Sequence, residues 1–201
     1  MSDEVHESVA AYGAPPRRWT VRDYYRAAAK GVFGDDEKLE LIRGEVVELS
    51  PQKNRHAHAT YLLRRALESA FPGSIVREHS PIRLDEVNEP EPDVAVSRGP
   101  AATYSKRHPN ANDLLLVAEV ADSSLLKDRK LKGPLYAEFG IPEYWILDLQ
   151  SNRLEVYRDP GMDSSGNGSY AVVEVLDVHA TVTPLNSNGS EISIRDVVPG
   201  A

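Results

Sequence analysis

In the first third of the chain, two segments carry apolar residues at helical spacing, and the segment between them has the alternation of a strand. A helix is predicted over 20–29, because Thr20 followed by Asp23 is a helix-capping signal. Alternation over 39–49 predicts two short strands joined at Arg43-Gly44. Apolar residues at helical spacing predict a second helix over about 56–71. Its expected buried stripe consists of Ala59, Leu62, Leu63, Ala66, Leu67 and Ala70.

The middle and the end of the chain are predicted to be mainly strands. The short apolar run at 114–118 is typical of a strand that is buried on both faces. A basic helix should follow and end near Phe139, where Gly140 supplies a left-handed cap. Pro134 should delay its first turn or kink it. Further strands are expected at 74–78, 82–85, 92–96, 143–148, 153–157 and 170–176, with short β segments near Thr181 and at 191–194, and loops at 98–112 and 159–169.

These elements predict one α+β domain with a mixed, twisted β-sheet. Residues 1–17 are polar and contain Pro15-Pro16, so they are expected to form a flexible tail. The remainder, 18–201, is expected to be the single domain, since chains usually divide only beyond roughly 250 to 300 residues.

Composition narrows the class of protein. Hydrophobic residues make up 41% of the 201 residues, which is enough for a core. The absence of cysteine excludes disulfides and thiolate sites. No signal peptide or membrane span is recognisable, so we expect a cytoplasmic protein without membrane contact. The net charge of −8 argues against non-specific coating of nucleic acid, but it does not exclude a nucleic-acid enzyme.

Candidate chemistry lies at the end of the apolar run. Glu119 follows it directly, and a carboxylate at the rim of a core needs a partner. Asp93 begins another predicted strand, and Lys132 lies early on the helix that packs back over the sheet. Two carboxylates from separate strands can bind Mg²⁺, and a nearby ammonium can orient a water or stabilise developing charge. Each signal is weak alone, because an aspartate after proline is usually a turn residue and a helix lysine is usually solvated.

Other polar residues have simpler explanations. His56 and His58 are two positions apart, so on a helix they face nearly opposite ways and cannot share one metal ion. Ser123 and Ser124 are better explained as helix caps than as nucleophiles. Tyr136 is expected to be a core residue. A solvated turn is expected for the acids Glu86, Glu89 and Glu91. Two explanations remain for the basic residues Lys53, Arg55, Arg64 and Arg65, which could line a path for phosphates or form the solvent-exposed face of a helix.

An ordered set of motifs then becomes informative. The chain contains EPDVAV at 91–96, LLVAEV at 115–120, DRKLK at 128–132 with LYA at 135–137, and GIPEYWILD at 140–148. Upstream it contains ELIRGE at 40–45, SP at 50–51 and RHA at 55–57. Together these resemble the Uma-type family of restriction endonucleases in the PD-(D/E)xK nuclease superfamily. The likeness extends over about 17–158.

The resemblance implies a restriction-endonuclease-like fold, which is an α/β/α-like arrangement with a mixed β-sheet flanked by helices. It also implies Mg²⁺-dependent hydrolysis of DNA, with Mn²⁺ as a possible substitute. It implies that Asp93, Glu119 and Glu40 bind the metal ion. The superfamily lysine position is Ala121 here, so the site is either inactive or takes its ammonium from the next helix. Lys132 matches the family's displaced lysine, and Lys130 is the alternative.

His56 matches the family pattern and is a candidate contact for phosphate or for a metal-bound water, as is Lys130 for phosphate. The leading hypothesis is therefore a Mg²⁺-dependent DNA endonuclease in which Asp93, Glu119, Lys132 and Glu40 are catalytic. The alternatives are a catalytically silent nuclease-fold binding protein and a metal-dependent phosphoesterase acting on small substrates. Because cutting a duplex requires two sites, a homodimer is expected.

Overall fold

The computed structural model describes residues 16–34, 36–49 and 51–200. Most of the flexible tail expected at 1–17 therefore lies outside the described residues. The chain forms two compact units. The first comprises Met1–Leu49 and Asp85–Glu89, and the second comprises Ser50–Leu84 and Pro90–Ala201. The single domain expected over 18–201 stays a prediction.

The first unit contains helix α2 (Val21–Ala28) and strands β1 (Leu39–Ile42) and β2 (Glu45–Glu48), as predicted. The Thr20 side chain caps α2 by accepting a hydrogen bond from the Asp23 amide at 3.1 Å. The two strands pair antiparallel through Arg43-Gly44, and both turn residues have positive φ, at 53° and 76°. Positive φ at both central positions defines a type I′ turn, whose twist matches that of a hairpin.

One expectation for the first unit is wrong. Glu89, which was assigned to a solvated acidic turn, is only 3% exposed. Its backbone pairs with Leu41 of β1, and its carboxylate accepts a hydrogen bond from the Tyr25 hydroxyl at 2.6 Å. The acidic segment is therefore partly built into the unit, because a β-bridge and a tyrosine donor compensate for its burial.

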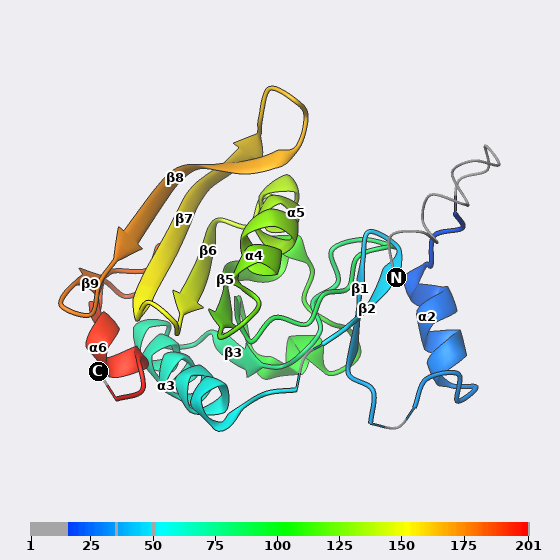
Figure 1. Cartoon of the computed structure of the whole chain (residues 1–201), viewed down its shortest axis with the longest axis horizontal. Coiled ribbons are helices and arrows are strands. Elements are labelled where there is room, and N and C mark those ends of the chain that lie inside the picture. Colours follow the sequence, from blue (N-terminus) through cyan, green and yellow to red (C-terminus); the bar gives the residue numbers. More distant parts are fainter. Residues whose placement is uncertain (1–15, 35, 50, 201) are drawn as a thin grey trace. The chain divides into compact units, whose positions relative to one another are not determined.

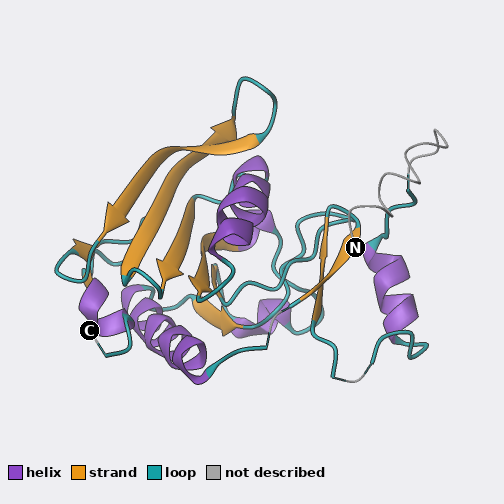
Figure 2. Cartoon of the chain, viewed as in Figure 1, coloured by secondary structure: helices purple, strands orange, loops and turns teal. Residues whose placement is uncertain are grey.

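The second unit is built on a six-stranded sheet (Figures 1 and 2). The strands lie in the order β3-β4-β5-β6-β7-β8, and only β5 and β6 run parallel. A parallel pair needs a crossover connection, which the helical segment after β5 supplies. The strands are β3 (Ile75–Glu78), β4 (Val94–Ser97), β5 (Leu114–Ala121), β6 (Glu143–Asp148), β7 (Arg153–Met162) and β8 (Gly168–Leu176). The predicted α+β fold with a mixed sheet is confirmed.

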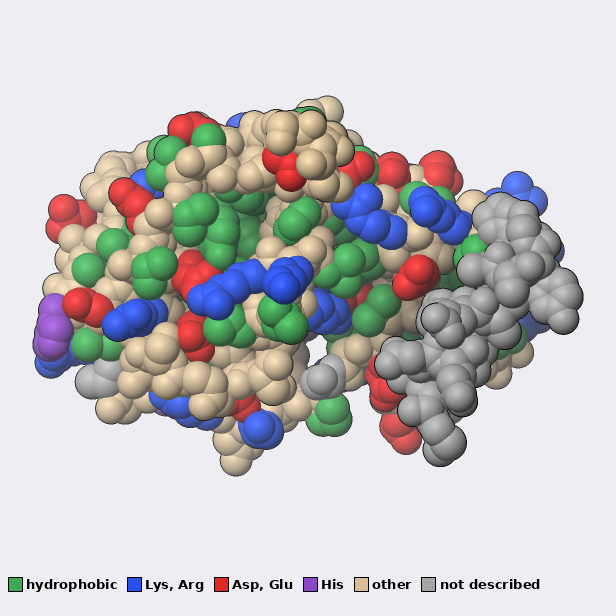
Figure 3. Space-filling view, turned by 45° about the horizontal axis from the view of Figure 1, so that its top comes forward, with side chains coloured by type: hydrophobic (Ala, Val, Ile, Leu, Met, Phe, Trp, Pro, Cys, Tyr) green, Lys and Arg blue, Asp and Glu red, His purple; other side chains and the backbone are tan. Residues whose placement is uncertain are grey.

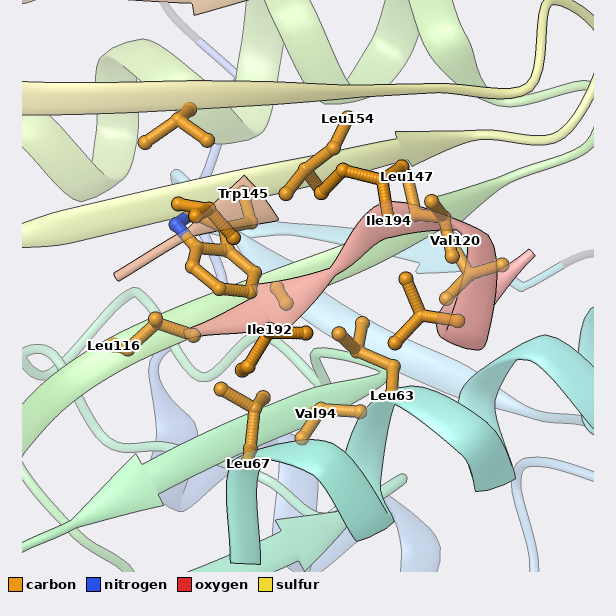
Figure 4. Close-up of a cluster of buried hydrophobic side chains, with 14 of the residues drawn as sticks. Leu63, Leu67, Val94, Leu116, Val120, Trp145, Leu147, Leu154, Ile192 and Ile194 are labelled. Carbon is orange, nitrogen blue, oxygen red and sulfur yellow. The ribbon is translucent and has the colours of Figure 1, made fainter. Parts of the chain in front are cut away.

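Helices cover the two faces of this sheet with separate apolar clusters. Helix α3 (Asn54–Ala70) packs Leu63 and Leu67 against one face, which Trp145 and Val94 also line (Figure 4). The other face packs against the crossover, made of α4 (Leu125–Lys127), the π-helix η3 (Asp128–Lys132) and α5 (Gly133–Glu138). The break predicted at Pro134 is real, since α5 begins there after a π-helical turn.

Shorter elements complete the second unit. They are the 3-10 helices η1 (Ala101–Tyr104) and η2 (Ala111–Asp113), strands β9 (Thr181–Val182) and β10 (Ile192–Ser193), and helix α6 (Ile194–Val197). The short β segments predicted near Thr181 and at 191–194 are thus confirmed, and they pair with each other. Gly140 has φ of 70° and occupies the left-handed position expected after α5.

Two predicted boundaries in the second unit are wrong. Residues 82–84 form no strand and make one isolated bridge, between Arg83 and Asn110. The neighbour of Asn110 is Pro109, which has no amide proton, so a ladder cannot continue there. The long loop expected at 159–169 is mostly strand, because β7 and β8 pair as far as Met162 and Gly168. Strand β6 begins at Glu143, opposite Arg158, so the extension of β7 has no partner on that side and can contain Pro160.

In the described part of the chain, no helix combines the length and the apolar character required to cross a bilayer.

Candidate active site

The two carboxylates predicted to act together lie at neighbouring positions of strands β4 and β5. The antiparallel register pairs Val94 with Ala118, so the next step along the two strands places Asp93 opposite Glu119. Glu119 faces the crossover helices, because Val117 and Ala121, two residues either side of it on β5, belong to that apolar cluster.

Asp93 is held at the end of β4 by the backbone of β5. Its Oδ2 atom accepts a hydrogen bond from the Val120 amide at 2.7 Å. This bond fixes the Asp93 carboxylate beside the Glu119-Val120 peptide, and it satisfies a donor of the sheet edge at the same time. The aspartate therefore does not behave as the free turn residue that its position after Pro92 suggested.

Lys132 reaches the same place from the crossover segment. Its Nζ atom donates to Glu119 Oε1 at 2.9 Å, and both side chains are only 4% exposed. Tyr136 is one turn further along, and its hydroxyl donates to the same oxygen at 2.9 Å. A buried ion pair is tolerated only when further hydrogen bonds compensate for its desolvation, and Tyr136 supplies one. Tyr136 thus belongs to the apolar core, as predicted, and also to the site.

The π-helical turn explains how Lys132 and not Lys130 faces inward. Lys132 is buried within the site, whereas Lys130 is exposed. Both residues lie on η3, two positions apart, and they point to different sides, as expected for that spacing on a helix. Single-turn π-helices occur frequently at functional sites. Lys132 therefore brings an ammonium to Glu119 from thirteen residues further along the chain, and its role as the displaced lysine stays a prediction.

Two histidines flank Asp93. The Nε2 atom of His56, from α3, lies 3.2 Å from Oδ2, and the Nδ1 atom of His79 lies 3.4 Å from Oδ1. Burial alone would raise the pKa of Asp93, but hydrogen bonds from both histidines and the charges of His56 and Lys132 lower it well below its usual range. For His56, burial lowers the pKa, and the hydrogen bond and charge of Asp93 outweigh that effect and raise it. Asp93 is therefore ionised at neutral pH.

His79 was not anticipated from the sequence. It lies directly after β3, adopts a left-handed φ of 43°, and its amide donates to the Asp93 carbonyl at 3.1 Å. Its side chain also lies 2.9 Å from the Gln52 amide nitrogen. A histidine after a short strand has no distinctive spacing to other site residues. Only the pairing of β3 with β4 brings it beside Asp93.

Asp128 is a further buried acid near the lysine. It is 2% exposed, and its Oδ2 atom accepts a hydrogen bond from the Ser124 hydroxyl at 2.6 Å. Burial raises its pKa, which the charge of Lys132 and the Ser124 hydrogen bond partly counteract. Ser124 stands at the N-cap position of α4, but the expected side-chain capping bond is absent, because the Ser124 hydroxyl donates to Asp128 instead.

The remaining candidate residues make other contacts or lie elsewhere in the structure. His58 is exposed on α3, so it does not join His56. Lys53 pairs with Asp122 at 2.9 Å, and Arg55 donates to the Leu149 carbonyl at 2.7 Å. Glu40 is 1% exposed on β1 of the first unit, and its role as a metal ligand stays a prediction. The phosphate contacts of His56 and Lys130 also stay predictions.

The donor set is suited to one type of metal ion. Asp93 and Glu119 offer carboxylate oxygens from adjoining strands, and such hard donors suit Mg²⁺. Within the described residues, no three His, Asp or Glu side chains converge as a ready-made metal cage. Mg²⁺ does not need one, because it usually retains several waters and is bound through one or two carboxylates together with substrate phosphates. The type of donor therefore agrees with Mg²⁺, and binding of the ion stays a prediction.

Comparison with known proteins agrees with the geometry. The family model Uma2, described as "Putative restriction endonuclease", matches residues 21–197. A crystal structure described as a putative nuclease belonging to DUF820 from Anabaena variabilis superposes with a TM-score of 0.68. It is 17% identical, and the match covers 89% of this chain and 97% of the other. At that identity the likeness supports the fold alone. No curated protein matches the chain.

Proposed function

The chain belongs to the Uma2 family of restriction endonucleases, and from this premise we propose that it hydrolyses phosphodiester bonds in DNA with Mg²⁺ as the metal ion. A nuclease-type function follows from the family and the fold. The choice of DNA and of Mg²⁺ belongs to the proposal. The observation that carries it is the buried contact between Lys132 Nζ and Glu119 Oε1, which brings an ammonium to the carboxylates although Ala121 occupies the usual lysine position.

Each residue of the site has a defined task in this proposal. Asp93 and Glu119 would hold the ion, and Glu40 is proposed to complete its coordination. When bound, Mg²⁺ would polarise a phosphoryl oxygen and lower the pKa of a water molecule. Lys132 orients the attacking water or stabilises the negative charge that develops on the phosphoryl group.

The surrounding residues position this machinery. Tyr136 holds the Glu119 carboxylate through its 2.9 Å hydrogen bond, so the oxygen that meets Lys132 is fixed before substrate binds. The Val120 amide and the two histidines hold Asp93 ionised and in place. Preorganised charges of this kind stabilise a transition state more strongly in a site that excludes water than in solution. In this scheme the protein contributes mainly orientation and electrostatic stabilisation.

A cleavage assay tests the proposal. Supercoiled and single-stranded DNA are incubated with Mg²⁺ or Mn²⁺ and with wild type, Asp93→Asn or Lys132→Met protein. Loss of one such electrostatic group is expected to lower the cleavage rate by about 100-fold or more. Lys130→Met is the matched comparison, because that lysine is two residues away and exposed. Thermal melting of each variant separates a lost function from a lost fold.

The outcomes discriminate between the alternatives. Full activity of Lys132→Met together with an inactive Lys130→Met would overturn the lysine assignment. A folded wild type that binds neither ion and cuts no DNA would indicate a catalytically silent nuclease-fold binding protein. Ala121 motivates this alternative, because it occupies the usual lysine position. Cleavage of bis(p-nitrophenyl) phosphate without cleavage of DNA would indicate a phosphoesterase for small substrates.

A further inference from the structure

The segment between Arg17 and Gly34 differs in charge from the rest of the chain. It contains five basic residues and one acid, whereas the whole chain carries a net charge of −8. The basic residues are Arg17, Arg18, Arg22, Arg26 and Lys30. The acid, Asp23, is already engaged, because its Oδ2 atom accepts hydrogen bonds from the Thr20 hydroxyl at 2.9 Å and from Arg17 at 3.4 Å. This part of the first unit is therefore locally cationic.

The same segment lines a cavity of about 700 Å³ that is open to solvent, and Asp23 is part of the lining. Four of the five basic side chains line it, namely Arg17, Arg18, Arg26 and Lys30. Trp19 and Val32 contribute apolar surface to the lining. Among the residues that the structure describes, none forms an ion pair with Arg18, Arg26 or Lys30. A hollow that combines an aromatic ring with several cations suits a ligand that has both a flat apolar body and negative charge.

The wall of this cavity is held in place by the β1–β2 turn. The Trp19 amide donates to the Gly44 carbonyl at 2.8 Å, and the Trp19 ring packs against Phe33 with centroids 6.0 Å apart. Gly44 lies so close that a Cβ there would meet the Arg18 Cβ at 2.6 Å. Arg18 and Trp19 are thus fixed at the backbone, which reduces the entropy lost when a ligand binds.

We propose that this cavity binds a single-stranded segment of nucleic acid, with phosphates on Arg18, Arg26 and Lys30 and one base against Trp19. Sequence-tolerant binding of single strands combines a cationic groove with aromatic side chains on which bases stack. The identity of the polyanion rests on the proposed nuclease function. The surface itself lies in the first unit, and it would bind the substrate through residues that are not part of the cleavage site.

The first test measures binding without metal ion, so that cleavage plays no part. A fluorescent single-stranded oligonucleotide is titrated with wild type and with the triple variant Arg18→Gln/Arg26→Gln/Lys30→Gln. The variant should bind at least tenfold more weakly near 50 mM salt. Its slope of log K against log salt should be shallower by about 2, because each phosphate contact on a single strand contributes roughly 0.7.

The control triple is Lys106→Gln/Arg153→Gln/Arg195→Gln, which removes the same charge from exposed positions of the second unit. Equal weakening by both triples would overturn the proposal, because it would show that only net charge matters. No weakening by the first triple would overturn it as well. At saturating DNA, the first triple should keep the wild-type cleavage rate and raise KM, whereas Asp93→Asn should bind and not cut. The experiment can therefore contradict the proposed binding surface without contradicting the proposed cleavage site, and the reverse.

The second test concerns the base. Trp19 is half-buried and Trp145 is fully buried, and they are the two tryptophans of the chain. Oligonucleotide should quench the Trp19 emission, and the quench should disappear in Trp19→Phe. An abasic strand of equal length should bind roughly tenfold more weakly, since stacking on an aromatic residue is worth about 1–3 kcal/mol per base. Unchanged emission, or equal affinity for the abasic strand, would contradict the base contact.

Discussion

At the scale of single residues, the site depends on ionised groups that are buried and fully engaged. Glu119 and Lys132 are each almost inaccessible, so the removal of one would leave the other charge buried without a partner. Such losses typically cost about 3–5 kcal/mol. This is why melting curves accompany the activity assay for Lys132→Met. The same energetics explain Tyr136, whose hydroxyl adds a second donor to the Glu119 oxygen.

A different acid, Asp113, makes stability depend on pH. Its carboxylate forms a two-pronged ion pair with Arg107, at 2.5 and 3.1 Å, and caps η2 by accepting the Asn110 amide at 2.8 Å. The hydrogen bond to Arg107 chiefly lowers its pKa, burial raises it less, and the Asn110 amide lowers it further. A folded-state pKa below the unfolded value of about 3.9 means that this stabilisation is present above pH 3.9 and is lost as pH falls through the folded value.

Asp113→Asn is therefore expected to lower stability at pH 7 by about 1 kcal/mol, because Arg107 is 44% exposed and solvent screens the pair. That corresponds to a decrease in Tm of about 2–4 °C. The difference from wild type should shrink below about pH 4. Calorimetry between pH 3 and 7 measures it, with Glu191→Gln as a control at an exposed acid. A difference that grows at acid pH would contradict the assignment.

At the scale of elements, the crossover after β5 determines where the lysine points. It begins as α4, continues as the π-helix η3 and ends as α5, with Pro134 at the start of that last helix. Proline cannot donate a backbone hydrogen bond and clashes with a regular helix before it, so the preceding turn is wider. Lys132 sits on this turn, and Tyr136 follows on the regular helix. The irregularity thus brings both side chains to Glu119.

The close packing of α5 on β8 gives a stability prediction. A Cβ at Gly168 would lie 2.0 Å from the Pro134 carbonyl oxygen and 2.5 Å from the Glu138 amide nitrogen, which are backbone atoms that cannot move aside alone. Gly168→Ala should therefore destabilise the protein by about 1–3 kcal/mol or more through overpacking. It should also displace α5 and slow cleavage.

Gly161→Ala is the matched control for that prediction. Gly161 lies on β7 of the same hairpin, and a Cβ there would have no atom within 4 Å. Urea denaturation of the two variants compares them directly. Equal stability of Gly168→Ala and Gly161→Ala would show that the contact between α5 and β8 is looser than described.

At the scale of the whole molecule, charge is distributed unevenly. On the face drawn in Figure 3, basic and acidic side chains lie next to one another, so a polyanion would be bound by local groups and not by a uniformly basic surface. This fits a protein with a net charge of −8 whose basic residues are concentrated in short segments such as 17–30.

The proposed cutting of duplex DNA implies two sites, and hence a homodimer, since one site attacks one strand at a time. Sedimentation velocity over a range of micromolar concentrations should give a mass near twice 22.2 kDa. With supercoiled plasmid, a dimer should produce linear DNA with little accumulation of nicked circles. A monomer that only nicks would contradict the dimer and would leave the hydrolytic site unaffected.

The sequence by itself determined the order and type of most elements and the identity of the motif residues. Apolar periodicity is a local property, so it predicted α2, α3 and most strands, and capping and turn chemistry predicted Thr20, Gly140 and Arg43-Gly44. The motifs that resemble the Uma-type family also identified Asp93, Glu119 and Lys132 as candidates. It failed at 82–85, where the segment makes only one bridge to Asn110, and at 159–169, where the β7–β8 hairpin continues further toward its turn than the turn-forming composition suggested.

Only the tertiary structure decided how these residues meet. The pairing of β4 with β5 brings Asp93 beside the Glu119-Val120 peptide, the pairing of β3 with β4 adds His79, and the crossover brings the Lys132 ammonium to Glu119. These relations depend on contacts between residues far apart in the chain, and no local pattern encodes them. Burial then changes the chemistry, because a carboxylate and an ammonium removed from water must be matched to each other at hydrogen-bond distance.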